Sequence, residues 1–530
     1  MTTPPEGRHP VEGEAFTPTG PTPDGPNLTR RTLTGFSWTF AATLAGLVAQ
    51  LAYTSVINRL LPPDTFGLVA SAQAVLIGGQ FLSELGVGRA VVQKTHLDVA
   101  DQRTAFTSSL LLGAALTGGL VLAAPLVGVL FDEPDVVGVT RGLALLLLAN
   151  AIGITATSVL RRELRFKAVA LLDLGSFAVG YLVIGIGAAV AGFGVWSLVA
   201  AAVSKAAIEG VGSLVLARHP MRPLLARRSL AEMYAFGSQV SIVGAVEYVS
   251  GQLPVAAVGR LRGQAALGQF SRAAYLVDLP FIQISNALTD VLFPAVARIK
   301  AERVRVRVAY MTSLRVTAAL LLPTAAGAAV ASDELVAVVL GDQWERAAAV
   351  LPLLAAHATL MMLVHYAAIV CEALAVLWQK LVIQVATFAV LAAGFVVVRD
   401  DGLEAFAVVM VIAQVVRLIG YWALMARQLG LPAASQPAAL LAPAVTAALT
   451  AGAIAGWTAV GGRLGLPTAL VLMLQIVVGG AVLAWGFWYG PRRRIRDERV
   501  ERLELADAGG GRTMRTVLAV LRVGRAEPQI

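Results

Sequence analysis

The chain is a series of long apolar runs separated by short polar segments. A helix needs about 20 apolar residues to cross the hydrocarbon core of a bilayer, and each run has roughly that length. We interpret the runs as membrane-spanning helices at 33–55, 66–86, 105–130, 139–160, 169–191, 195–217, 233–257, 267–293, 308–331, 347–370, 380–398, 403–425, 437–459 and 467–489. The pattern therefore predicts an all-α polytopic membrane protein with about 14 transmembrane helices.

Two of the polar segments share one pattern. Arg59–Ala72 and Arg260–Ala273 each place an Arg-Leu pair eight residues before a glycine, at an offset of 201 residues. The pair Asp132-Glu133 recurs as Asp333-Glu334 at the same offset. Six predicted spans, an even number, separate the copies, so both copies face the same way. This predicts a parallel repeat, with two six-helix lobes around an axis along the membrane normal.

The repeat divides the chain into predicted units. Residues 30–230 form an N-lobe with spans 1–6, and residues 231–430 form a C-lobe with spans 7–12. Residues 431–490 add two C-terminal helices. The proline-rich segment 1–29 is predicted to be a disordered cytoplasmic tail, and 491–530 a second cytoplasmic tail.

Charge fixes the predicted orientation. The chain is 57% hydrophobic with a mean hydropathy of +0.73, so its net charge of +9 indicates membrane topology rather than nucleic-acid binding. Basic residues gather in alternate loops, around 30–31, 89–103, 161–167, 218–228, 298–307 and 492–496, and acidic residues in the others, around 132–135, 333–342 and 400–401. The positive-inside rule then places both termini in the cytoplasm.

Enzyme motifs are absent from the sequence. It contains no glycine-rich loop followed by Lys-Ser or Lys-Thr, no HExxH and no CxxC pattern, and Cys371 is its single cysteine. The adjacent pair Asp400-Asp401 lies in a short loop, where a solvated loop end explains it. We therefore expect transport without covalent chemistry, with no catalytic residue, metal or cofactor.

Several segments, taken in order, resemble the Wzx-type polysaccharide and O-antigen flippases similar to colanic acid exporters, in the multidrug/oligosaccharidyl-lipid/polysaccharide exporter superfamily. The segments that carry the resemblance are Arg59–Ala72, Leu85–Lys94, Leu160–Lys167, Gly192–Val199, Leu267–Ala273 and Leu292–Ala295. The resemblance implies a bacterial cytoplasmic-membrane protein. It would flip an undecaprenyl-pyrophosphate-linked oligosaccharide by alternating access, for exopolysaccharide or lipopolysaccharide biosynthesis. A polymerase and glycosyltransferases are the implied partners.

Ionisable residues inside the predicted spans are the candidate site residues, because each costs about 2.5–3.5 kcal/mol at the bilayer centre and needs a reason. Cations that could compensate a pyrophosphate are Lys205, Arg272, Arg315 and Arg417; candidates for charge balance or ion coupling are Glu209, Glu247, Asp278 and His357. The competing interpretation is mutual ion pairing that holds the lobes, for example between Lys205 and Glu209, four residues apart on one helix.

Two other functions remain open at this stage. A cation-coupled small-molecule exporter of the same superfamily would share the fold, and an ion-dependent drug-efflux assay separates it from a flippase. A membrane glycosyltransferase or ligase would transfer sugar as a purified protein, and the short predicted outer loops argue against it.

Overall fold

The computed structural model describes residues 45–84, 91, 97–218, 220, 222–227, 230, 241–279 and 302–489, which are almost entirely helical. This confirms the predicted all-α class. The predicted tails at 1–29 and 491–530 lie outside the described residues, as do most of Leu85–Lys94 and all of Leu292–Ala295.

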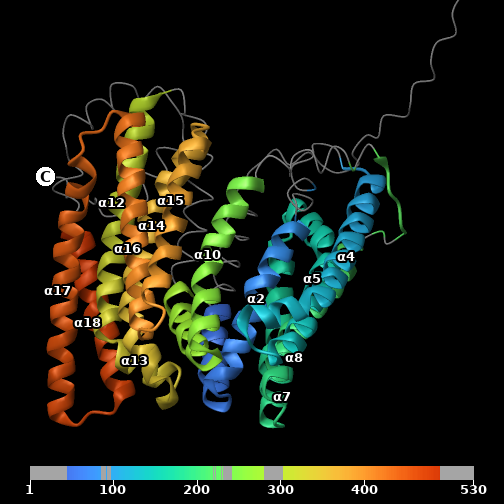
Figure 1. Ribbon diagram of the computed structural model, residues 1–530, viewed down its shortest axis with the longest axis horizontal. Coiled ribbons are helices and arrows are strands. Elements are labelled where there is room, and N and C mark those ends of the chain that lie inside the picture. The colour runs from blue at the N-terminus through green and yellow to red at the C-terminus, as the bar shows by residue number, and fades with distance from the viewer. Residues whose placement is uncertain are drawn as a thin grey trace, which may run out of the picture.

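A first bundle is built from the N-terminal half of the chain (Figure 1). It contains a helix at 45–60, α2 (Pro63–Glu84), α4 (Val99–Phe131), α5 (Asp135–Arg162), α6 (Phe166–Phe177), the π-helix η1 (Ala178–Gly185), α7 (Ile186–Val190) and α8 (Val195–Ala217). Local chemistry sets the ends of α4. Asp98 and Asp101 form a reciprocal capping box at its start, and Asp132 ends it in a left-handed conformation.

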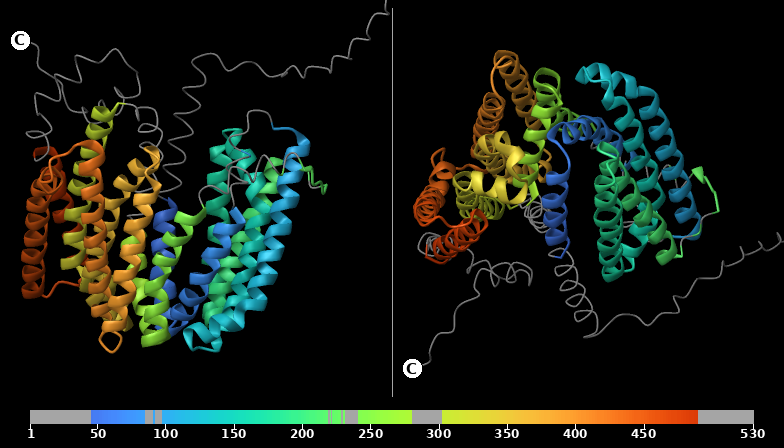
Figure 2. Two further views of the ribbon diagram at one scale, coloured as in Figure 1. Left: turned by 45° about the horizontal axis from the view of Figure 1, so that its top comes forward. Right: turned by 90° about the horizontal axis from the view of Figure 1, so that it is seen from below.

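A second bundle is built from the C-terminal half. It contains α12 (Arg303–Val330), α13 (Ser332–Val339), the 3-10 helix η3 (Asp342–Trp344), α14 (Glu345–Ala373), α15 (Leu377–Val397), α16 (Leu403–Leu429), α17 (Ser435–Leu464) and α18 (Thr468–Tyr489). Between the bundles lie α10 (Ser241–Arg262) and a helix at 264–279. The helix α10 contacts α15 and α16 on one side and α2 and α4 on the other. Figure 2 shows α10 and α2 at this junction from below.

Ten helices in the described part are long and apolar enough to cross a membrane. The protein is therefore a polytopic membrane protein. Each of the predicted spans overlaps a described helix, and the total of fourteen stays a prediction. The predicted loop between 332 and 346 differs from the structure. It contains α13 and η3, because Asp333 and Glu334 favour a helix start and the apolar residues after them reach the core.

The bundles meet at one end, which we call the sealed end. It carries the connections at residues 61–63, 132–134, 263, 331–345 and 398–402. From there α2 and α10 run toward the opposite end (Figure 1), and Tyr248 of α10 still contacts Ala74 of α2. Hydrogen bonds cross between the bundles at the sealed end: Trp344 Nε1 donates to Asn58 O at 3.0 Å, and Gln343 Nε2 donates to Leu61 O at 3.0 Å.

Two glycines permit the closest backbone approach at the sealed end. A Cβ atom on Gly67 of α2 would overlap the carbonyl of Gln264, and a Cβ atom on Gly268 would overlap the carbonyl of Pro63. Gly67 and Gly268 are 201 residues apart, and so are Pro63 and Gln264. The contact is thus reciprocal, which is how two copies of one unit meet across a two-fold axis.

Two arginines repeat this reciprocity. Arg59 donates to the carbonyl of Val338 at 2.6 Å, near the end of α13, and Arg260 donates to the carbonyl of Val129 at 3.1 Å, near the end of α4. Each arginine, again at an offset of 201, places its charge at the negative end of a helix in the other half. The lobe boundaries at 230 and 430 remain a prediction.

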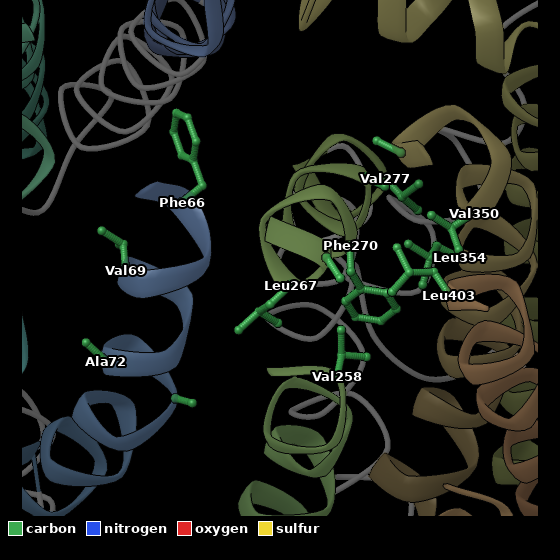
Figure 3. Close-up of a cluster of buried hydrophobic side chains, with 14 of the residues drawn as sticks. Phe66, Val69, Ala72, Val258, Leu267, Phe270, Val277, Val350, Leu354 and Leu403 are labelled. Carbon is green, nitrogen blue, oxygen red and sulfur yellow. The ribbon is translucent and has the colours of Figure 1, made fainter. Parts of the chain in front are cut away.

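A continuous hydrophobic core joins both halves behind these contacts. Phe66, Val69 and Ala72 of α2 are buried in the same cluster as Leu267 and Phe270. Figure 3 shows these side chains together with Val258 of α10, Val350 and Leu354 of α14 and Leu403 of α16. The sealed end is therefore packed as a protein core, and opening it requires exposure of apolar surface.

Candidate functional site

Arg272 lies just inside the sealed end, between the two halves. It is eight residues along the helix at 264–279, about 12 Å from that helix's start. Its guanidinium stacks over Phe66 of α2 at 4.3 Å and over Tyr275 at 5.2 Å. Its Nε is buried without an acceptor, and the described residues provide no carboxylate or hydrogen bond to it. A cation in this environment is suited to an anion from outside the protein.

Aromatic side chains continue from Arg272 into the first bundle. Gln50 donates to the hydroxyl of Tyr275 at 2.6 Å. Tyr53, three residues after Gln50, meets Tyr181 of η1 edge to face, with ring centroids 4.9 Å apart. The hydroxyl of Tyr53 is buried and has no hydrogen-bond partner within the described part of the chain. These tyrosines and Arg272 lie within electrostatic range of one another, so they form one polar region on the first bundle's side.

Lys205 of α8 is compensated within the first bundle. Its Nζ lies 2.8 Å from Asp173 of α6 and 2.8 Å from Glu209 of α8. The Lys205–Glu209 pair is the one that the spacing on one helix predicts, whereas Asp173 reaches Lys205 from another helix. Gly180 of η1 makes this site possible, because a Cβ there would lie 2.8 Å from the Lys205 backbone nitrogen. A role for Lys205 as a substrate ligand stays a prediction.

Glu209 also lines a cavity of about 260 Å³ between α2, α5 and α8. Its other polar lining residues include Gln80, Asn150, Thr157 and Arg161. The cavity lies within the first bundle rather than between the bundles.

A second charged cluster joins four helices in the other half. Lys380 of α15 lies 3.0 Å from Glu247 of α10 and 2.6 Å from Glu372 of α14. Arg417 of α16 lies 3.6 Å from Glu247. Lys380 is the first residue of the predicted span 380–398, and in the structure it lies in the first turn of α15 with only 3% of its side chain exposed. Its carboxylate partners come from other helices, and spacing within one helix could not reveal them.

The other predicted residues are not brought into one site. His357 is only partly exposed on α14, with Nδ1 3.3 Å from the carbonyl of Met410. Arg315 on α12 and Asp278 on the helix at 264–279 are partly buried, and neither forms an ion pair within the described ranges. Arg272 and Arg417 thus remain the two predicted cations that contact helices at the junction between the bundles.

Two bundles of helices long enough to span a bilayer, joined at one end, are the architecture of a polytopic membrane protein. The polysaccharide biosynthesis protein family model matches residues 56–350, more than half of the chain. The chain belongs to this family. This confirms the predicted resemblance.

Named relatives agree with this family. The succinoglycan biosynthesis transport protein ExoT of Rhizobium meliloti is 26% identical over 75% of this chain and 80% of its own length. The lipopolysaccharide biosynthesis protein WzxC of Escherichia coli is 22% identical over 62% of this chain and 67% of its own. Among solved structures, the lipid II flippase MurJ in an inward closed conformation matches with a TM-score of 0.67 at 11% identity. The match covers 86% of this chain and 99% of the MurJ chain, which shows that the two share a fold.

Proposed function

We propose that this protein flips a lipid-linked oligosaccharide across a bacterial cytoplasmic membrane, for synthesis of a surface polysaccharide. The family and the names of its relatives support this, since these relatives are named for succinoglycan biosynthesis transport and for lipopolysaccharide biosynthesis. The substrate class implied is an oligosaccharide on undecaprenyl pyrophosphate. Glycosyltransferases that build this lipid and a polymerase that uses its sugar are the partners we propose.

The orientation of the proposed transporter follows from loop charge. The sealed end carries the acidic loops around 132–135, 333–342 and 400–401, so it faces outward. Both termini then lie in the cytoplasm, and the ends of α2 and α10 that are remote from the sealed end face the leaflet in which the substrate is made. Transport by alternating access requires the sealed end to separate while the cytoplasmic ends come together.

Arg272 is the single residue that most directly supports the proposed function. It is a cation between the bundles, next to the seal, without a counter-ion in the described part of the chain. A pyrophosphate held there would gain charge-assisted, bidentate hydrogen bonds from the guanidinium. It would also sit where separation of the sealed end gives access to the outer leaflet.

Export by Arg272 variants tests this role. In cells that depend on the protein for surface polysaccharide, Arg272→Gln should reduce export about ten- to a hundredfold, the loss of 1.5–3 kcal/mol expected for a charged hydrogen bond. Arg272→Lys should rescue only partly, because an ammonium lacks the planar fork. Arg399→Gln is the matched control, since Arg399 is exposed and pairs with neighbouring Asp400.

Amounts of membrane-inserted protein are measured in parallel. Normal export by Arg272→Gln at wild-type abundance would remove Arg272 from the substrate site. No second function is favoured by the structure, because a shared fold with other exporters says nothing of their substrates.

A further inference from the structure

The cluster around Lys380 is arranged asymmetrically. Lys380 is 3% exposed, whereas Glu247 and Glu372 are 34% and 42% exposed. The two carboxylates therefore lie between the lysine and the surroundings. Any ligand that approaches Lys380 meets a carboxylate first, and it can reach the ammonium only by taking a carboxylate's place.

Glu247 occupies a position between two cations. The same atom, Oε1, lies 3.0 Å from Lys380 Nζ and 3.6 Å from Arg417 Nη2. A phosphate oxygen forms the same kind of contact with a lysine and an arginine. The 3.6 Å contact is longer than a hydrogen bond, so Glu247 accepts no hydrogen bond from the Arg417 guanidinium.

Two buried hydrogen-bond donors on α16 have no acceptor among the described residues. They are Arg417 Nε and the hydroxyl of Tyr421, a side chain with no exposed surface. Tyr421 lies one helical turn beyond Arg417, and its ring centroid is 5.8 Å from the guanidinium carbon. An anion with several oxygens can accept from these donors, whereas the single carboxylate of Glu247 leaves them unsatisfied.

Because of the charge balance in the cluster, Glu247 can be displaced only by another anion. Among the described residues the cluster holds two cations and two carboxylates, and Lys380 has a second carboxylate partner in Glu372 at 2.6 Å, which is independent of Glu247. Arg417 would then be an uncompensated charge, which is unfavourable at a partly buried site. Glu247 is therefore expected to leave only when another anion arrives.

The helix that carries Glu247 also contacts the first bundle. The next residue, Tyr248, donates its hydroxyl to the carbonyl of Ala74 in α2. Release of Glu247 from α15 and α16 thus acts on the helix that lies between the two halves. Binding of a ligand in place of Glu247 is therefore coupled to the relative arrangement of the two bundles.

We propose that Lys380, Arg417 and Tyr421 form a pyrophosphate site in which Glu247 takes the place of the ligand when the site is empty. The head group of the substrate displaces Glu247 and frees α10 from α15 and α16. This inference rests on the proposed function for the identity of the ligand, and on the ion pairs for the site itself. It adds a second anion contact to the one proposed at Arg272.

Binding to the purified full-length protein tests the site. Titration calorimetry is performed with inorganic pyrophosphate and, separately, with farnesyl pyrophosphate. Glu247→Gln should bind both probes about tenfold more tightly, because the competing carboxylate is removed. Lys380→Gln and Arg417→Gln should bind at least about tenfold more weakly. Glu404→Gln, at an exposed carboxylate elsewhere on α16, is the matched control and should leave affinity unchanged.

The opposite signs separate a ligand site from a structural ion pair. If the cluster only holds helices together, Glu247→Gln and Lys380→Gln change binding in the same direction or leave it unchanged, and the inference is overturned. If Lys380→Gln does not fold, Arg417→Gln provides the same comparison, because the Lys380–Glu372 pair remains intact there. Tighter binding of inorganic than of farnesyl pyrophosphate overturns the lipid head group as the ligand.

Export in cells is measured independently. A wild-type protein that exports polysaccharide but binds neither probe contradicts this inference and leaves the proposed function in place. A wild-type protein that binds both probes but exports nothing supports the site and contradicts the function.

Discussion

The buried cations of this protein fall into distinct electrostatic situations, and the difference decides what each can do. Lys205 has two carboxylates within 2.8 Å, so a ligand would have to compete with both. Lys380 also has two, but one of them is shared with Arg417. Arg272 has aromatic neighbours and no carboxylate in the described ranges. Depth in the membrane alone, which is what the sequence offers, does not distinguish these situations.

The crossing of Gly67 and Gly268 is the residue-scale feature most sensitive to substitution. Gly67→Ala or Gly268→Ala would press a methyl group into a backbone carbonyl, so the two helices must move apart. We expect each variant to lower the stability of the purified protein by about 1–3 kcal/mol, as overpacking does. The measurement is thermal unfolding in detergent, followed by export in cells.

Gly251→Ala is the matched control for the glycine crossing. Gly251 is also within a helix, α10, but a Cβ there meets no atom within 4 Å. Alanine at such a position should be neutral or slightly stabilising, because it lowers the entropy of the unfolded chain. Equal effects of all three substitutions would show that the crossing has no special tightness.

Only part of the candidate site could be predicted from the sequence. Lys205 with Glu209 followed from their spacing on one helix, and the pair is present. Asp173 and Glu372 were missed, because each reaches its lysine from another helix, and helix-to-helix contacts leave no trace in local spacing. The start of α15 matters as well. The predicted span begins at Lys380, whereas the helix begins at Leu377, so Lys380 lies within its first turn and in a buried ion pair.

At the scale of elements, hydrophobic length predicted the helices well. Long apolar runs have no alternative to a helix in a bilayer, where every backbone group must be bonded within the segment. The pattern was less informative for α13, a short helix in a predicted loop, and for η1, where a π-helix interrupts a continuous span. Neither α13 nor η1 changes the length of an apolar run, so the apolar pattern cannot reveal them.

The orientation of the helices is testable one loop at a time. Reporter fusions at Asp135, at the sealed end, should be active as an outside reporter, because the acidic loops face outward. Fusions at Arg165, between α5 and α6, should be active as an inside reporter. The reverse result at both positions would invert the protein in the membrane and remove the direction of transport we propose.

At the scale of the whole molecule, the reciprocal contacts at the sealed end support the parallel repeat inferred from the offset of 201 residues. Gly67 with Gly268 and Arg59 with Arg260 are each related by that offset and meet opposite halves. A two-fold arrangement gives the two halves equivalent surfaces on which to separate. The residues that carry the repeat pattern in the sequence, Arg59 with Gly67 and Arg260 with Gly268, are the residues that form these contacts.

The central claim is that separation of the sealed end moves a lipid-linked oligosaccharide across the bilayer. Ser71 and Gln264, whose side chains lie 2.9 Å apart across that end, are replaced by cysteine in a Cys371→Ala protein. The protein is reconstituted into vesicles that contain the lipid-linked oligosaccharide. Its sugar is then oxidised from outside with periodate that does not cross the membrane.

With the two cysteines reduced, we predict that all of the lipid-linked oligosaccharide becomes accessible to periodate. With the cysteines joined by a short cross-linker, only the share in the outer leaflet should react, as in vesicles without protein. Protection of the inner-leaflet share by the reduced protein would contradict the flippase function. Complete oxidation with the cross-linked protein would contradict the role of the sealed end.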